Sequence, residues 1–96
     1  MGLIETTTFR LESGSDEQAF LQSDRRVQTE LVPNQPGFLR RTTARSDDGW
    51  LVLTLWATNE HAEAFAALAV GHEVQLEFEQ HIDAGSVTTR RYETLG

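Results

Sequence analysis

The sequence predicts one α+β domain spanning residues 1–96, with elements in the order βαββα(α)β. The hydrophobic period changes along the chain between the two-residue alternation of strands and the three-to-four-residue spacing of amphipathic helices. Clusters of glycine, proline, serine and aspartate separate these stretches. A chain of 96 residues that is 39% hydrophobic and 24% charged also has the length and composition of a single globular domain.

The first third of the chain predicts a strand followed by a long helix. Residues 5–12 are rich in threonine, which favours extended backbone. Ser15 or Asp16 is the expected N-cap of a helix that runs to about residue 31. The apolar stripe of this helix comprises Phe20, Val27 and Leu31. Residues 32–37 contain two prolines and a glycine, which predict a turn.

The middle of the chain predicts a β-hairpin. Residues 38–45 and residues 50–56 are the two strands. Ser46-Asp47-Asp48-Gly49 between them is the expected hairpin turn, and Asp48-Gly49 is its strongest signal.

The remaining segments complete the order. Thr58 is the expected cap of a second helix over residues 59–70. Residues 72–83 fit either a strand or a short helix, and we favour the helix. Residues 86–93 predict the last strand. This order is the ferredoxin-like pattern, with a four-stranded, mostly antiparallel sheet and helices on one face.

The strand over residues 50–56 predicts a homodimer because both of its faces are apolar. One face carries Leu51, Leu53 and Leu55, and the other carries Trp50, Val52, Thr54 and Trp56. Helices cover only one face of such a sheet, and we expect the face with the two tryptophans to be left open. A second copy would cover it and form a two-fold α/β barrel. The alternative is a partly exposed Trp at a strand end.

Charge and composition argue against several classes of function. The net charge of −7 disfavours nucleic acid and anionic membranes as partners. The absence of cysteine removes disulfides, thiolate zinc sites and thiol catalysis. No apolar run is long enough for a membrane span, and the N-terminus does not resemble a signal peptide, so we expect a cytoplasmic location. The chain also lacks glycine-rich phosphate loops and lysine, which disfavours nucleotide cofactors.

Three short segments carry a family resemblance that extends over nearly the whole chain. They are Pro36-Gly37-Phe38, Leu53-Thr54-Leu55-Trp56 and Ser86-Val87 with the following Arg90-Arg91-Tyr92. In this order and spacing they resemble the dimeric α/β-barrel superfamily, specifically the antibiotic biosynthesis monooxygenase-like domains. The resemblance implies a homodimer with a pocket between sheet and helices in each protomer. Members include cofactor-independent monooxygenases, haem-degrading enzymes and proteins without an assigned activity.

The haem-degrading branch fits this sequence poorly. Its members resemble the chain in the Trp that closes the third strand, here Trp56. They also use an Asn on the first strand, where this chain has three threonines, and a haem-ligating His at a position that here falls in residues 65–67. His61 comes too early and His72 too late. We therefore expect no cofactor and no metal.

Candidate binding residues are aromatic and basic. Trp56 and Phe20 would hold a planar ring, although both also fit a structural core. One Arg of the pair Arg40/Arg41 and one of Arg90/Arg91 should point inward, and an inward Arg could bind an anionic oxygen or form structural ion pairs. The candidate substrate contacts are Trp56, Phe20, Arg40, Arg90 and Tyr92.

Two residues are candidates for proton transfer. His61 follows Trp56 closely and could overhang a pocket, and Asp24 lies beside the apolar helix stripe. Each also fits an ordinary structural role. His61 fits a capping or surface position, and Asp24 fits an ion pair.

Two functions therefore remain open. The first is a cofactor-independent monooxygenase that acts on a planar aromatic molecule of the quinol or anthrone type. The second is a non-catalytic homodimeric binding or scaffold domain. An open pocket beside Trp56 would favour the first, and a filled core the second.

Overall fold

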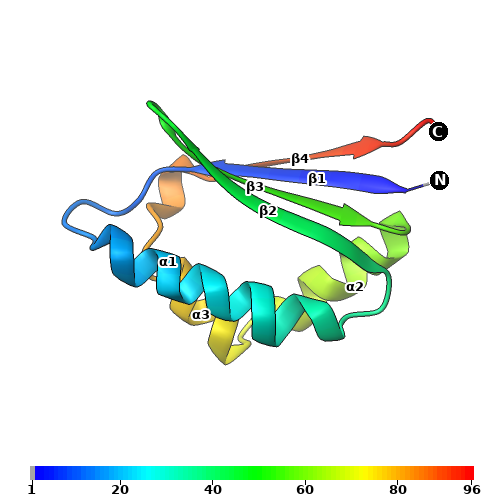
Figure 1. The fold of residues 1–96 in the computed structure, drawn as a ribbon, viewed down its shortest axis with the longest axis horizontal. Helices are drawn as coiled ribbons and strands as arrows, with labels where there is room; N and C mark the ends of the chain where they lie inside the picture. The colour runs from blue at the N-terminus through cyan, green and yellow to red at the C-terminus, as the bar shows by residue number, and fades with distance from the viewer. Residues whose placement is uncertain (1) are drawn as a thin grey trace.

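A computed structural model, which describes residues 2–96, arranges the chain in two layers (Figure 1). The strands are β1 (Leu3–Phe9), β2 (Phe38–Ser46), β3 (Gly49–Trp56) and β4 (Thr88–Glu93), and the main helices are α1 (Glu17–Arg26), α2 (Asn59–Ala69) and α3 (Glu73–Glu79). The sheet has the order β2-β3-β1-β4, and all neighbouring strands are antiparallel. The helices lie together on one face of it. The predicted α+β, ferredoxin-like fold is confirmed.

The long first helix has the predicted extent but changes its hydrogen bonding. The side chain of Asp16 accepts a hydrogen bond from the backbone N–H of Gln18 at 3.0 Å, which makes Asp16 the N-cap. After α1 the chain continues as a π-helical segment (Val27–Leu31) and then a 3₁₀ turn (Val32–Asn34). Proline in this turn has no backbone N–H, so the helix cannot continue.

The second half also follows the predicted order. Thr58 caps α2 by accepting a hydrogen bond from the backbone N–H of His61 at 3.1 Å. The ambiguous stretch 72–83 contains the short helix α3, as favoured from the sequence. Its N-cap is His72, whose Nδ1 accepts a hydrogen bond from the backbone N–H of Val74 at 3.1 Å.

The first and last strands are shorter or shifted relative to the sequence prediction. β1 ends at Phe9 rather than at residue 12, because the backbone N–H of Arg10 donates to the Ser86 hydroxyl at 2.8 Å instead of to a strand. β4 starts at Thr88 rather than at residue 86, because Ser86 belongs to a 3₁₀ turn (Ala84–Ser86).

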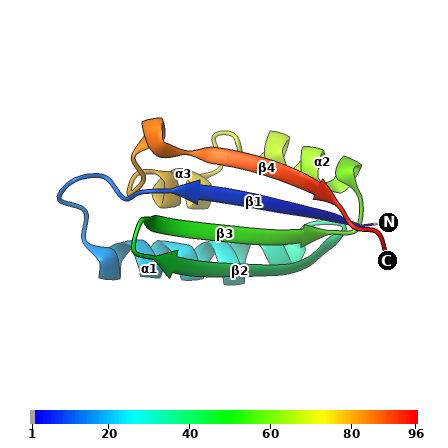
Figure 2. The ribbon, with the colours of Figure 1, turned by 90° about the horizontal axis from the view of Figure 1, so that it is seen from above.

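The face of β3 that carries both tryptophans packs under the helices. Trp50 lies 4.9 Å from Phe20 of α1, and Trp56 lies 5.2 Å from Phe65 of α2, measured between ring centroids. The prediction that this face stays open is therefore wrong, since the larger aromatic side chains are the ones that the helices bury. The open face carries the three leucines instead, and Figure 2 looks onto it.

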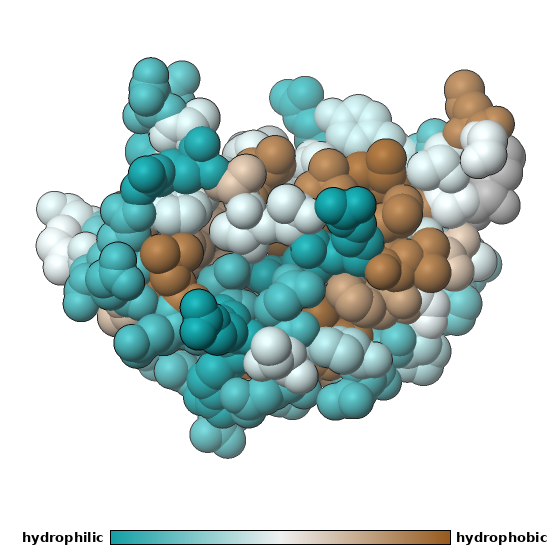
Figure 3. All heavy atoms as spheres, viewed as in Figure 1, coloured by the Kyte–Doolittle hydropathy of each residue, from teal (hydrophilic) through white to brown (hydrophobic). Residues whose placement is uncertain are grey.

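The core between the layers divides into two adjoining clusters. The larger contains Phe9, Phe20, Val27, Leu31, Val32, Val52, Val74 and Phe78. The smaller contains Leu3, Trp56 and Ala62, with Phe38 and Phe65 packed against both clusters. In the space-filling view, hydrophilic residues cover the lower, helical side, and apolar residues gather near the sheet towards the end with the termini (Figure 3). The core thus fixes the sheet and the helices around the space described next.

Candidate functional site

A cavity of about 250 Å³ lies between the helix-covered face of the sheet and the helices. Its apolar walls include Phe9, Val27, Val32, Val52, Phe65 and Phe78. The polar side chains that line it from the strands are Glu5, Thr7, Arg41 and Thr54. Apolar walls with a few convergent polar groups are typical of small-molecule sites.

The mouth of the cavity lies between α3 and the segment that leads into β4. Three of its lining residues there, Glu79, Ala84 and Val87, are exposed to solvent. The lining residues of the sheet and of the two helical turns that follow α1 are buried or half-buried. A ligand would therefore enter from the side of α3 and β4.

Arg41 is the buried cation of the site. Its side chain retains 4% of its exposure, and its Nη1 donates to Asp24 Oδ1 at 2.8 Å. Nη1 also lies 3.3 Å from Thr43 Oγ1 and 3.4 Å from Gln28 Oε1. The Thr43 hydroxyl in turn donates to Asp24 Oδ1 at 2.8 Å. This network neutralises Arg41 and fixes the position of its guanidinium group.

The guanidinium group retains donors for a ligand. A guanidinium has five N–H donors, and among the described residues the side-chain hydrogen bonds of Arg41 all leave from Nη1. Its central carbon lies 5.4 Å from the centre of the Phe78 ring, which also lines the cavity. An anionic oxygen and an aromatic ring could both be held at this end of the cavity.

Glu5 places a carboxylate at the cavity beside Thr54. The two residues are directly paired between β1 and β3. Glu5 Oε2 accepts a hydrogen bond from Arg91 Nε at 2.8 Å, and the Glu5 side chain retains 21% of its exposure. Arg91 is thus the member of its pair that faces the helices, and it pairs with the carboxylate of the cavity-lining Glu5.

Asp24, a predicted catalytic residue, lies behind Arg41 rather than on the cavity wall. Its Oδ1 accepts from both Arg41 and Thr43, and Asp24 is not among the lining residues. The arrangement suits a role in orienting Arg41 better than direct contact with a ligand.

Trp56 and Phe20, the predicted aromatic contacts, belong to the packed core. Trp56 retains 1% of its exposure and Phe20 retains none, and neither lines the cavity. Phe65 lines the cavity and lies against Trp56. The indole Nε1 of Trp56 is buried and has no hydrogen-bond partner among residues 2–96, which is an unusual state for a buried donor.

His61 lies at the start of α2, outside the cavity lining. Its Nδ1 is 2.8 Å from Thr58 Oγ1, and its ring packs against Gly37. Gly37 has a φ of +76°, so glycine suits both this backbone conformation and the close approach of the ring. These contacts join α2 to the turn before β2.

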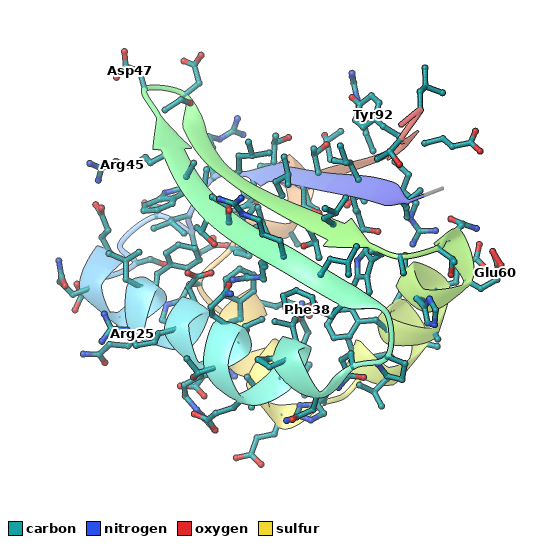
Figure 4. All side chains as sticks on the ribbon, turned by 45° about the vertical axis from the view of Figure 1, so that its right-hand side comes forward. Arg25, Phe38, Arg45, Asp47, Glu60 and Tyr92 are labelled. Atoms are coloured by element: carbon teal, nitrogen blue, oxygen red, sulfur yellow. The ribbon has the colours of Figure 1, made fainter. Side chains whose placement is uncertain are left out.

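Arg40, Arg90 and Tyr92 lie on the open face of the sheet, away from the cavity. They are paired with Leu55, Thr6 and Ile4, respectively, which share that face. Figure 4 shows Tyr92 on the far side of the sheet from the helices, whereas Phe38 lies between the two layers. The predicted contacts are therefore divided between the two faces and do not form one site.

Glu5 and Thr54 are not among the residues predicted from the sequence, which left open whether Arg40 or Arg41 points inward. Alternation places Glu5 on the same face as Phe9, which was a usable signal. The signal for Arg41 was hidden by a bulge between Phe38 and Arg40, which shifts the register so that Phe38 and Arg41 both face the helices.

Within residues 2–96 no three histidine, aspartate or glutamate side chains lie close enough to hold a metal ion. No helix in this range combines the length and apolarity needed to cross a bilayer.

Comparison with known proteins identifies similar structures but no similar sequences. The chain matches no protein-family model, and no curated protein matches it in sequence. SnoaB, a cofactor-independent oxygenase from Streptomyces nogalater, is similar with a TM-score of 0.81 and 13% identity, over 99% of this chain and 94% of that one.

Two other solved structures have the same architecture. A protein from Bordetella bronchiseptica, provisionally assigned as an antibiotic biosynthesis monooxygenase, gives a TM-score of 0.77 at 15% identity over 99% of both chains. A dimeric ferredoxin-like protein of unknown function from Jannaschia sp. CCS1 gives 0.74 at 11% identity, over 98% of this chain and all of the other. At these sequence identities the structural similarity establishes the fold. This fold agrees with the one implied by the family resemblance of the sequence.

Proposed function

We propose that the protein binds a small phenol or enol with a planar ring in the cavity and oxygenates it with O₂, without a cofactor. The single observation that carries the proposal is Arg41, a buried cation with unused N–H donors at the wall of an otherwise largely apolar cavity. Such a group stabilises the anion of an acidic aromatic compound. The structural likeness to a cofactor-independent oxygenase supports the choice of reaction.

The cavity volume favours a small substrate. An apolar cavity of about 150 Å³ is known to hold one benzene molecule. A cavity of about 250 Å³ therefore has room for one or two fused rings. Three-ring compounds of the anthrone type would exceed this space, so a two-ring quinol precursor such as 1-naphthol is the better test substrate.

The proposed reaction begins with transfer of the phenolic proton to Glu5. Arg41 holds the resulting oxyanion, which carries electron density to the ring carbon opposite the oxygen. This carbanion-like carbon transfers one electron to O₂, and the two radicals combine to form a C–O bond. The peroxide takes the proton back from Glu5. Cleavage of the O–O bond, with loss of the remaining proton of that carbon, releases water and leaves a quinone. For 1-naphthol the balance is one O₂ consumed and one water released for each naphthoquinone.

The other candidate residues have supporting roles in this proposal. Asp24 holds Arg41 in place through their 2.8 Å contact. Trp56 supports the cavity wall from behind Phe65. His61 anchors the first turn of α2.

A non-catalytic binding domain is the second candidate. The observation that favours it is the complete burial of Trp56 and Phe20, which act as core residues and do not contact the cavity. In that case the cavity would bind the same kind of molecule without consuming O₂.

We also infer that two copies pair through the open faces of their sheets. The half-buried Leu51, Leu53 and Leu55 form the apolar centre of this face, and no helix of residues 2–96 covers it. Arg40, Arg90 and Tyr92 would then lie in or around the interface. A similar fold in a protein described as dimeric supports this assembly.

The proposal is tested by closing the mouth of the cavity without touching the core. Ala84 is exposed and lines the mouth, so Ala84→Trp should block it. Ala67 is exposed on α2 and does not line the cavity, so Ala67→Trp is the matched control. The measurements are calorimetric binding of 1-naphthol and its conversion to naphthoquinone in an oxygen electrode.

We expect the wild type and Ala67→Trp to bind 1-naphthol and to consume one O₂ per quinone, and Ala84→Trp to lose both properties. Binding without O₂ consumption would favour the non-catalytic function. Failure of the wild type to bind would overturn the proposed site.

A further inference from the structure

We infer that Phe65 sets the upper size limit of the ligand, because its ring is the partition between the cavity and Trp56. This inference rests on the proposed function only in taking the cavity as a site for small aromatic molecules. It assigns a specificity-determining role to a residue that the proposed reaction does not use.

The position of Phe65 carries the argument. Phe65 projects from α2 and lines the cavity, whereas Trp56 does not line it. The two rings lie 5.2 Å apart between centroids, with planes tilted by 34°. The Phe65 ring therefore has the cavity on one side and the indole on the other.

The side chains around Trp56 indicate that the cavity can be enlarged at Phe65. Trp56 contacts the apolar side chains of the smaller core cluster, Leu3 and Ala62, and its ring also packs edge-to-face with Phe38. Removing the Phe65 ring would add an aromatic-lined space to the cavity. A flat third ring fits between aromatic walls, since stacked and edge-to-face contacts both favour it.

The surroundings of Phe65 also differ from those of the other cavity aromatics. Phe9 and Phe78 are buried and pack against each other and against Phe20 in the larger cluster. Phe65 is only half-buried and packs at the junction of the two clusters. A smaller residue at position 65 is therefore better tolerated than at the other two positions.

Phe38 provides a matched control. It also is a half-buried Phe in contact with Trp56, at 5.8 Å between centroids, but it does not line the cavity. Phe65→Leu and Phe38→Leu therefore remove the same atoms from the same neighbour, and only the first should enlarge the cavity.

The experiment compares two ligands that differ by one fused ring, 1-naphthol and 1-anthrol, by anaerobic calorimetry. We expect the wild type to bind 1-anthrol at least about tenfold more weakly than 1-naphthol, since an oversized group must displace the wall. Phe65→Leu should bind the two ligands with similar affinity. Phe38→Leu should keep the difference in affinity that the wild type shows. Phe65→Trp is a second variant with the opposite effect on cavity volume. Its larger side chain reduces the cavity and should weaken the binding of 1-naphthol.

Each other result contradicts the inference in a distinguishable way. Equal binding of both ligands by the wild type would show that Phe65 imposes no limit. An equal gain in 1-anthrol affinity in Phe65→Leu and Phe38→Leu would mean that a loosened core causes the effect, and not the loss of the Phe65 ring from the cavity wall. If the wild type binds 1-naphthol but Phe65→Leu gains no affinity for 1-anthrol, this inference is overturned and the proposed function stands. Binding of neither ligand by any variant would overturn both.

Discussion

At the scale of single residues, the site depends on one buried cation and the carboxylate that neutralises it. The Arg41 side chain is almost fully buried, and Asp24 retains 16% of its exposure. Removing one member of such a pair leaves an uncompensated charge in the interior, which costs far more than breaking an exposed pair. The pair therefore links the stability of the fold to the chemistry of the cavity.

Asp24→Ala should lower the free energy of unfolding by about 3 kcal/mol, because it leaves Arg41 buried without its counter-ion. Urea unfolding followed by circular dichroism measures this. The control is Glu17→Ala, which breaks the exposed pair of Glu17 with Arg45 and should cost less than about 1 kcal/mol. Similar losses in the two variants would mean that Arg41 finds another partner or reaches water.

At the scale of elements, the first turn of α2 is held by a glycine turn before β2. The ring of His61 packs where a Cβ on Gly37 would lie, and the carbonyl of Gly37 accepts a hydrogen bond from the backbone N–H of Ala57 at 2.8 Å. These contacts fix the end of β3 and the start of α2, on which Phe65 depends for its position.

Gly37→Ala should destabilise the fold more than Gly71→Ala does. Both glycines have a positive φ, +76° and +78°, so alanine at either site costs about 1 kcal/mol in backbone strain. Only at Gly37 would the new methyl group also collide with a side chain, the ring of His61; the space around Gly71 is open. We expect an additional loss of at least about 1 kcal/mol in thermal or urea unfolding. Equal losses would show that the ring of His61 moves away freely.

At the scale of the whole molecule, the two faces of the sheet have different roles. One face packs under the helices and encloses the cavity. The other presents the leucines of β3 together with Ile4 and Tyr92. An open apolar face of this kind is typical of an interface between copies.

Leu53→Arg should convert a dimer into a monomer, because Leu53 lies on β3 between Thr6 and Thr42 of the neighbouring strands, at the centre of the open face. Light scattering after size-exclusion chromatography should change from twice the chain mass of 10.8 kDa to that mass itself. Leu68→Arg, on the exposed part of α2, should remain dimeric. A monomeric wild type would remove the dimer inference.

The sequence by itself determined the identity and order of the elements. Asp16, Thr58 and the hairpin turn from Ser46 to Gly49 act through hydrogen bonds to residues a few positions away, so the local sequence predicts their effect. The alternation in β3 likewise separates its leucines from its tryptophans without reference to the rest of the chain.

The tertiary structure decided which face became the site. Alternation distinguishes the two faces of β3 but not which one the helices cover, and that choice follows from aromatic packing between Trp50 and Phe20 and between Trp56 and Phe65. The bulge after Phe38 turns Arg41 rather than Arg40 inward, and only there does it meet Asp24, seventeen residues away along the chain. The cavity residues converge from separate elements, so their proximity arises only when the layers pack.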